Sequence, residues 1–283
     1  MRYYVVDAFT NQPFGGNPAG VVFLESEQFP DEKLMLQIAA ELRYSETAFV
    51  RKDACKEFTV RYFTPKAEVE LCGHATIASF YLLHHEGLAS GTCLCHTLAG
   101  DLTVEAGEKV MMQMATPKLI DTPVDAERLH RIMASEASFI WPQQPIQIVS
   151  TGLPDIILPV ADLSTLNALA PDMEALSALS QELGVVGVHA FALSDDGFTA
   201  HVRNFAPLYG VPEESATGTA NAALTFYLFK QGIIPESAQC RFLQGEAMRR
   251  PSVVDTTLHN GAEIFVGGES FILAKGSFNI TLT

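Results

Sequence analysis

One glutamate of this chain, Glu46, lies in the segment SETAFV at residues 45–50. A carboxyl group can take a proton from a carbon atom and return it, and partial desolvation improves it in this role. The apolar residues Ala48, Phe49 and Val50, which follow Glu46, would supply such surroundings. From the residues alone, the plainer interpretation is that Glu46 caps or pairs at the end of a strand.

Two segments of small and polar residues, CGHAT at 72–76 and TGTAN at 217–221, each begin a predicted helix. A helix N-terminus presents unpaired N–H groups and a partial positive charge, and glycine there lets a ligand approach the backbone. Two such starts facing one cleft would bind a small anion without a lysine. Each segment alone favours the plainer interpretation, close helix–sheet packing, but their repetition favours the anion site.

Strand-like and helix-like segments alternate along the whole chain, which predicts an α/β protein. Strands are predicted at 3–9, 19–24, 47–51, 58–63, 92–119, 146–160 and 185–205, and helices at 31–42, 73–85, 125–134, 173–183 and 216–230. The last fifty residues or so return to a β pattern. The helix at 73–85 is apolar nearly all round, as is typical of a buried helix.

The strand motif VRYFTP at 60–65 returns as VRNFAP at 202–207, 142 residues later, and the glycines of the two helix starts are 145 residues apart. A repeat at half the chain length predicts two copies of one domain. Prolines near the middle of the chain suggest a linker. We therefore expect an N-terminal half at 1–120, a boundary region at 121–144 and a C-terminal half at 145–283, with the last strand able to return to the first half.

The chain has 283 residues and a formal net charge of -15. So many negative charges repel nucleic acid and anionic lipid headgroups, and we expect neither partner. Asp7 interrupts the first apolar stretch and no run of about 18 apolar residues follows, which indicates neither a signal peptide nor a membrane span. Five cysteines, an odd number in a long chain, favour the reducing cytoplasm over a disulfide framework.

Six segments together resemble the PhzF-like (phenazine-biosynthesis) family, and they follow one another in family order over nearly the whole chain. They are DAFTNQPFGGNPAGVV at 7–22, SETAFV at 45–50, RYFTPKAEVELCGHATIA at 61–78, AGDL at 99–102, EESATGTAN at 213–221 and QGEAMRRPS at 244–252. The resemblance implies the diaminopimelate-epimerase-like fold. This is an α/β (α+β) protein of two pseudo-symmetric halves, each a curved mixed sheet wrapped around a central helix.

The resemblance also implies a cofactor-independent isomerase in which Glu46 moves a proton on a small carboxylic acid substrate. It implies further catalytic roles for His74, as a donor or proton relay, and for Glu214 as a second acid/base. The expected substrate-binding residues are Asn17, Ser45, Gly73, Gly218 and Thr219. We expect no metal, no cofactor, a small anionic partner and a homodimer.

Three positions depart from the family pattern. Glu214 stands where the family usually has Asp, Thr219 where it has Ser, and His74-Ala75 where phenazine producers have His-Pro. Both acid and hydroxyl functions are kept, but Glu214 is longer by one methylene. We therefore expect a substrate other than the phenazine intermediate.

Two other functions remain open. A thiol epimerase of the same fold would use one cysteine at each helix start, and Cys72 provides the first; Thr217 at the second is far too weak an acid to replace a thiol. A non-enzymatic binding protein that retains the fold is the other, and turnover of any carboxylic acid would decide against it. Cys93, Cys95 and His96 suggest metal binding only weakly, because no second ligand pair completes the site.

Overall fold

A computed structural model describes residues 1–133 and 144–280. The chain forms two compact units. Unit 1 comprises Met1–Gln113 and Gly267–Thr283, and unit 2 comprises Met114–Val266. Within the described ranges, no helix combines the length and the apolar character that a membrane crossing requires.

Unit 1 is built on one mixed sheet. In pairing order its strands are β18 (Ser270–Ser277), β1 (Arg2–Ala8), β2 (Asn17–Leu24), β3 (Thr47–Ala54), β4 (Glu57–Phe63), β6 (Gly91–Thr97), β7 (Gly100–Ala106) and β8 (Val110–Gln113), with the short β5 (Glu68–Val69) beside β4. The pairs β2–β3 and β4–β6 are parallel and the other pairs are antiparallel. The pairing of β18 with β1 joins the two ends of the chain in one sheet.

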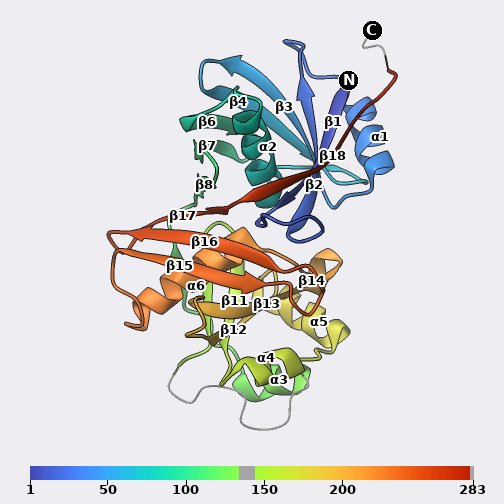
Figure 1. Cartoon of the computed structure of the whole chain (residues 1–283). Helices are drawn as coiled ribbons and strands as arrows, with labels where there is room; N and C mark the ends of the chain where they lie inside the picture. Colours follow the sequence, from blue (N-terminus) through green and yellow to red (C-terminus); the bar gives the residue numbers. More distant parts are fainter. Residues whose placement is uncertain (134–143, 281–283) are drawn as a thin grey trace. The chain divides into compact units, whose positions relative to one another are not determined.

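A single helix fills the centre of unit 1. α2 (Gly73–His85) packs against β1, β2, β3, β7, β8 and β18, and Figure 1 shows it among these strands. Because strands surround it, residues on every face of α2 are buried, which explains why the sequence has no polar stripe there. By contrast α1 (Glu32–Leu42), against β3 and β4, buries only Met35, Ile38 and Ala39 on one face.

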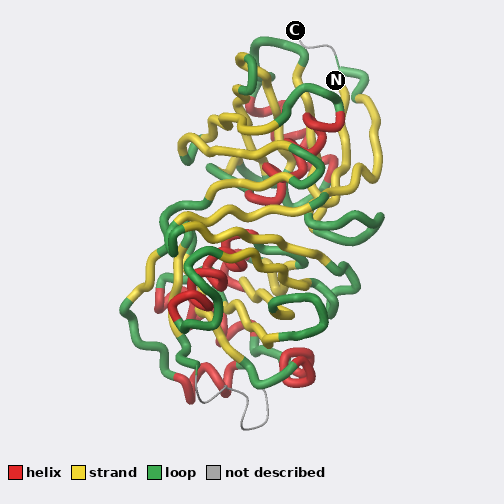
Figure 2. The backbone as a smooth tube through the Cα atoms, turned by 60° about the vertical axis from the view of Figure 1, so that its left-hand side comes forward, coloured by secondary structure: helices red, strands yellow, loops and turns green. Residues whose placement is uncertain are grey.

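Unit 2 has a second mixed sheet around α6 (Gly218–Lys230), and Figure 2 shows the strands in yellow and the helix in red. In pairing order its strands are β9 (Lys118–Ile120), β10 (Gln147–Ser150), β11 (Pro154–Pro159), β12 (Val188–Leu193), β13 (Ala200–Ala206), β15 (Ala238–Gln244) and β16 (Ser252–His259), with the short β14 (Val211–Glu214) beside β13. The remaining elements are α3 (Ala126–Ile132), α4 (Leu163–Ala168), α5 (Met173–Leu183) and η1 (Pro207–Tyr209), and β17 (Glu263–Gly268) leads the chain back into unit 1.

The two units repeat one pairing scheme. β1 to β4 pair antiparallel, parallel and antiparallel in turn, and β10 to β13 do the same. In each unit the fourth strand then pairs in parallel with the strand that follows the central helix, β6 or β15. The sequence repeat is therefore a repeat of structure, and the halves are pseudo-symmetric.

The structure differs from the sequence prediction in several places. The chain enters unit 2 after Gln113 and not near residue 121, because β9 pairs with β10; part of the predicted boundary region, 134–143, lies outside the described residues. α6 begins at Gly218 and not at residue 216, since Thr217 has the extended backbone of an N-cap. The sequence analysis missed α4, a six-residue helix whose first turn is capped by the Asp162 carboxylate, which accepts from the Thr165 N–H at 2.7 Å.

Candidate active site

Glu46 lies directly before β3, and the strands hold its backbone in place. Its carbonyl accepts a hydrogen bond from the Gly20 N–H at 3.1 Å. A side chain on Gly20 would not fit, because a Cβ there would lie 2.7 Å from Thr47 Oγ1. The three apolar residues that follow are fully buried, whereas the Glu46 side chain is 21% exposed. The carboxyl group is thus partly desolvated and still accessible.

The start of α2 supplies the second part of the site. Cys72 is the N-cap residue with an extended backbone, and Gly73 and His74 form the beginning of the first turn. A Cβ added to Gly73 would meet only Met112 Cε at 3.7 Å, an ordinary contact, so close packing does not require glycine at this position. The N–H groups of this turn have no partner within the helix and carry the positive end of its dipole.

His74 connects the groups that surround it. Its Nε2 lies 3.3 Å from Glu46 Oε2 and 3.4 Å from Ser45 Oγ, and its Nδ1 lies 3.4 Å from Cys72 Sγ. Ser45 Oγ is the hydrogen-bonding neighbour of Nε2, and the Glu46 carboxylate lies within ion-pair distance of the same nitrogen. When Nε2 carries the proton of the neutral ring, Nδ1 is an acceptor to which the Cys72 thiol can donate.

The surroundings of His74 favour its neutral form. Burial lowers the pKa of His74, and the nearby Glu46 carboxylate raises it by a smaller amount. A neutral imidazole can donate at one nitrogen and accept at the other, which is what a hydrogen-bonding relay requires. The four residues Ser45, Glu46, Cys72 and His74 therefore form one connected cluster in unit 1.

Asn17 belongs to the same end of the sheet. It is the first residue of β2, which runs parallel to β3 with Gly20 opposite Thr47. Parallel strands begin at the same edge of a sheet, so Asn17 and Glu46 lie at a common edge. Asn17 is buried, with 7% of its surface exposed.

The start of α6 in unit 2 carries its own cluster, in which Glu214 ends β14 and Thr217 is the N-cap. Thr217 Oγ1 donates to Glu214 Oε2 at 2.7 Å. Buried Gln244 holds both, because its Nε2 donates to the Glu214 carbonyl at 2.8 Å and to Thr217 Oγ1 at 3.0 Å, and its Oε1 accepts from the Thr217 N–H at 3.1 Å. Gly218 and Thr219 follow in the first turn, and Thr151 Oγ1 donates to the Thr219 carbonyl at 2.9 Å.

The structure thus divides the predicted site residues between the units. It brings Ser45, Glu46, Gly73 and His74 together in unit 1, and Glu214, Gly218 and Thr219 together in unit 2. The expectation that both helix starts serve one cleft stays a prediction. The sequence analysis missed two features. The first is the contact of Cys72 with His74, which only their spacing at a helix start indicated. The second is Gln244, which could have been found from its position in the segment QGEAMRRPS.

Metal ligands are also present in the unit 1 cluster. One ligand atom each of Glu46, Cys72 and His74 lie within 4.8 Å of one another. The sequence analysis also considered metal binding by Cys93, Cys95 and His96, and these residues have a structural explanation. Cys93 and Cys95 are buried on β6, where burial raises the pKa of the Cys95 thiol to about 12. His96 Nδ1 lies 2.7 Å from Asp101 Oδ1.

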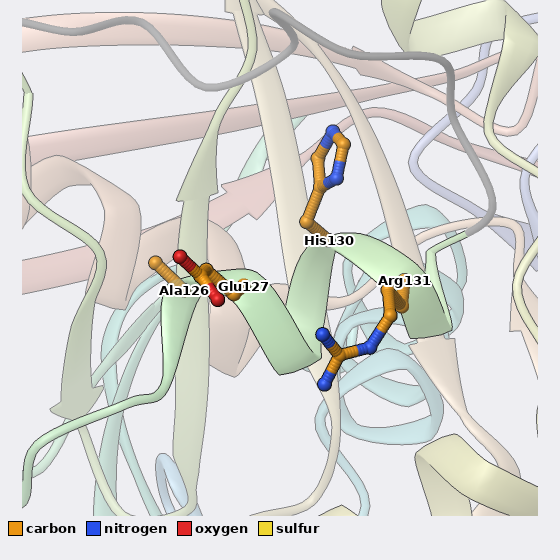
Figure 3. Close-up of a pocket in the computed structure, with 4 residues that line it drawn as sticks. All are labelled: Ala126, Glu127, His130 and Arg131. Atoms are coloured by element: carbon orange, nitrogen blue, oxygen red, sulfur yellow. The ribbon is translucent and has the colours of Figure 1, made fainter.

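A surface hollow of about 370 Å³ lies on α3, and Figure 3 shows the side chains that line it: Ala126, Glu127, His130 and Arg131. All four belong to one helix of seven residues, α3. None of these four residues belongs to the clusters at the starts of α2 and α6.

Comparison with solved structures identifies the fold class of this chain. A hydroxyproline epimerase from Agrobacterium vitis has a TM-score of 0.62 over 98% of this chain and 91% of its own, at 14% identity. A PhzF-family phenazine biosynthesis protein from Bacillus anthracis has a TM-score of 0.89 over 99% of both chains, at 26% identity. The predicted diaminopimelate-epimerase-like fold is confirmed.

Residues 6–276 match the model of the PhzC-PhzF family, phenazine biosynthesis-like proteins. An uncharacterized isomerase, YddE, of Escherichia coli O157:H7 is 32% identical over 99% of both chains. A trans-2,3-dihydro-3-hydroxyanthranilate isomerase of Pseudomonas chlororaphis is 30% identical over 98% of both. The chain belongs to the phenazine biosynthesis-like family, as its motifs predicted, and it is an isomerase.

Proposed function

We propose that this isomerase moves a proton on a small carboxylic acid, with Glu46 as the general acid/base and without a cofactor. The observation that carries the proposal is the 3.3 Å approach of Glu46 Oε2 to His74 Nε2 at the first turn of α2. Glu46 takes a proton from a substrate carbon, and the electron pair moves into the adjoining unsaturated system. Glu46 then returns the proton to a second carbon, so that the product has the composition of the substrate.

His74 and the helix start support this step. The Nε2–H of His74 stabilises the Glu46 carboxylate before the reaction and is free to donate to a substrate oxygen once Glu46 is protonated. The N–H groups at Gly73 and the positive end of the α2 dipole suit the carboxylate of the substrate. Ser45, 3.4 Å from Nε2, adds a hydroxyl group to the same side.

In the proposed mechanism Glu214 is a second acid/base, and Asn17, Gly218 and Thr219 bind substrate. The hydrogen bond from Thr217 and the fixed position imposed by Gln244 support a defined orientation of the Glu214 carboxyl group. The name of the Pseudomonas relative specifies an unsaturated ring acid as its substrate. We extend that chemical class to this chain, and we expect a different member of it because Glu214 and Ala75 depart from the family pattern.

The test is Glu46→Gln, which keeps the shape of the side chain and removes its acid/base function. Loss of a general acid/base lowers the rate by about 10²- to 10⁴-fold. The measurement is solvent deuterium incorporation, followed by NMR, into a panel of small unsaturated carboxylic acids. Glu41→Gln, at an exposed position of α1, removes the same charge and is expected to exchange at the wild-type rate. Wild-type exchange in Glu46→Gln would refute the assignment.

One observation favours a second candidate, the thiol mechanism: Cys72 Sγ lies 3.4 Å from His74 Nδ1, and His74 is the base that a reactive thiol needs. The position that corresponds to Cys72 at the start of α6 is Thr217. A two-base epimerase requires an acid on each face of the substrate, and a threonine hydroxyl is not acidic enough. We therefore rank the glutamate mechanism first.

A further inference from the structure

The groups at the start of α2 form a set of metal ligands, although proton transfer by Glu46 needs no metal. Glu46 offers a carboxylate oxygen, His74 an imidazole nitrogen and Cys72 a sulfur, and Cys72 and His74 are buried. Zinc prefers this combination, and three protein ligands with one open position are typical of accessible zinc sites. The negative charge of the chain also attracts a cation.

The spacing of the ligand atoms suits a tetrahedral ion. Zinc bonds of about 2.0 Å to nitrogen and oxygen and about 2.3 Å to sulfur place a nitrogen about 3.3 Å from an oxygen and about 3.5 Å from a sulfur. Glu46 Oε2 lies 3.3 Å from His74 Nε2, and Cys72 Sγ lies 3.9 Å from the same nitrogen. The sulfur therefore needs to approach this nitrogen by a few tenths of an ångström, and the Glu46 and Cys72 ligand atoms, which lie within 4.8 Å of each other, need to approach by up to about 1.3 Å.

We infer that Glu46, Cys72 and His74 bind a thiophilic divalent cation of the zinc class, and that the bound ion inhibits the isomerase. Binding replaces the thiol proton by the metal and releases that proton to solvent. A carboxylate oxygen bound to the ion no longer takes a proton from substrate, which is why the ion inhibits. The direction of this effect rests on the proposed function, whereas the binding itself does not. This site departs from the sequence prediction of no metal.

The test is titration of the full chain, first treated with a chelator, with Co²⁺ alone. A thiolate bound to Co²⁺ produces a near-ultraviolet charge-transfer band, which we expect in the wild type, and added Zn²⁺ should abolish it. We expect no band in Cys72→Ser. Cys55→Ser is the matched control, because Cys55 is the exposed cysteine among the free thiols and should leave the band intact. Absence of the band in the wild type, or its persistence in Cys72→Ser, overturns the site.

Glu46→Gln gives a second test that does not depend on a thiol substitution. Loss of even an outer-shell partner weakens metal binding by about 10- to 100-fold, and loss of a ligand should do at least as much. Unchanged Zn²⁺ affinity in this variant would contradict the three-ligand site, and turnover that rises with added Zn²⁺ would contradict inhibition. Because the spectrum needs no substrate, failure of the metal site and failure of Glu46 in deuterium exchange are separate results.

Discussion

His74 is the residue that joins acid, thiol and hydroxyl at the start of α2. Its ring nitrogens lie 3.3 Å from Glu46 Oε2 and 3.4 Å from Cys72 Sγ. Burial lowers the pKa of His74, so the ring is neutral near pH 7 and each nitrogen has one fixed role, donor or acceptor. Cys72 is thus a neighbour of the reacting groups in either mechanism, and only its removal distinguishes the two.

We expect Cys72→Ser to lower turnover much less than Glu46→Gln does. Serine keeps a small donor to His74 Nδ1, and in the glutamate mechanism the thiol neither takes nor gives the substrate proton. In a thiol mechanism the same change would remove the base itself. Deuterium exchange of both variants on one substrate measures the difference. An equal loss in the two variants would favour the thiol mechanism over the proposal.

At the scale of elements, the motif VRxFxP has a structural purpose in each unit. Arg61 makes two hydrogen bonds to the Glu68 carboxylate, at 2.7 and 2.6 Å, and lies over the Phe63 ring. Arg203 makes the same two bonds, both at 2.9 Å, to Glu213 and lies over the Phe205 ring. The first ion pair connects β4 to the short β5, and the second connects β13 to the short β14. Because each short strand leads into the central helix of its unit, the ion pair positions the helix start.

Behind the start of α6 lies a chain of buried polar side chains. Asn221 donates to the Gln244 amide oxygen at 2.9 Å and accepts from His189 Nε2 at 3.3 Å, and His189 Nδ1 accepts from Asn204 at 3.3 Å. Burial lowers the pKa of His189 to about 3, so this ring is neutral. Asp155 interacts with Asn204 of this group. Burial raises the pKa of Asp155 to about 7, and the charge of Glu214 contributes a smaller part of the rise.

Asp155 therefore makes stability depend on pH in a direction opposite to that of most carboxylates. Its pKa is 3.8 in the reference state and about 7 in the fold, so its contribution is complete below pH 4 and is lost as pH rises through about 7. In Asp155→Asn this loss should disappear, so the variant should gain stability relative to wild type between pH 4.5 and pH 8.

Urea unfolding of both proteins at the two pH values measures this effect. Asp195→Asn, at an exposed position, is the control and should follow the wild type. If the difference between Asp155→Asn and wild type is the same at both pH values, Asp155 is ionised in the fold throughout this range.

On the scale of the whole molecule, the frame is repeated but the chemistry is not. Thr47 and Val188 begin the third strand of their sheets and face equivalent residues, Phe63 and Phe205. The residue before Val188, which corresponds to Glu46, is Gly187, where an added Cβ would lie within bonding distance of the Phe205 carbonyl oxygen. Unit 2 therefore has no room for a second glutamate at this position, and its acid, Glu214, comes from a different strand.

If Glu46 and Glu214 act on one substrate molecule, their effects on turnover should be coupled. Glu46→Asp and Glu214→Asp each shorten the acid by one methylene. We expect the activation free-energy change of the double variant, calculated from kcat/KM, to differ from the sum of the two single changes by about 0.5–3 kcal/mol. The measurement is kcat/KM of the wild type, the two single variants and the double variant. Additive losses would indicate that the two acids do not share a reaction.

The expected homodimer and the cytoplasmic location remain predictions, which sedimentation and cell fractionation can test.

Local pattern determined much of what the sequence revealed. The apolar pattern predicted α2 and α5 at their observed bounds. A helix surrounded by strands is apolar on every face, whereas a helix with one buried face has apolar residues three or four positions apart. The VRxFxP repeat revealed two halves, since each copy must make the same Arg–Glu pair. The family motifs placed Glu46 and His74 in a candidate site before any distance was known.

Other features were decided only when distant segments came together. β18 pairs with β1 although almost the whole chain separates them, and no local pattern specifies which edge a terminal strand will join. The ionisation of Asp155 depends on burial beneath strands and a helix, which its neighbours in sequence do not supply. The ligand set of Glu46, Cys72 and His74 likewise required the register of β2 and β3 and the extended backbone at Cys72, because distances of a few ångströms are properties of packing and not of sequence spacing.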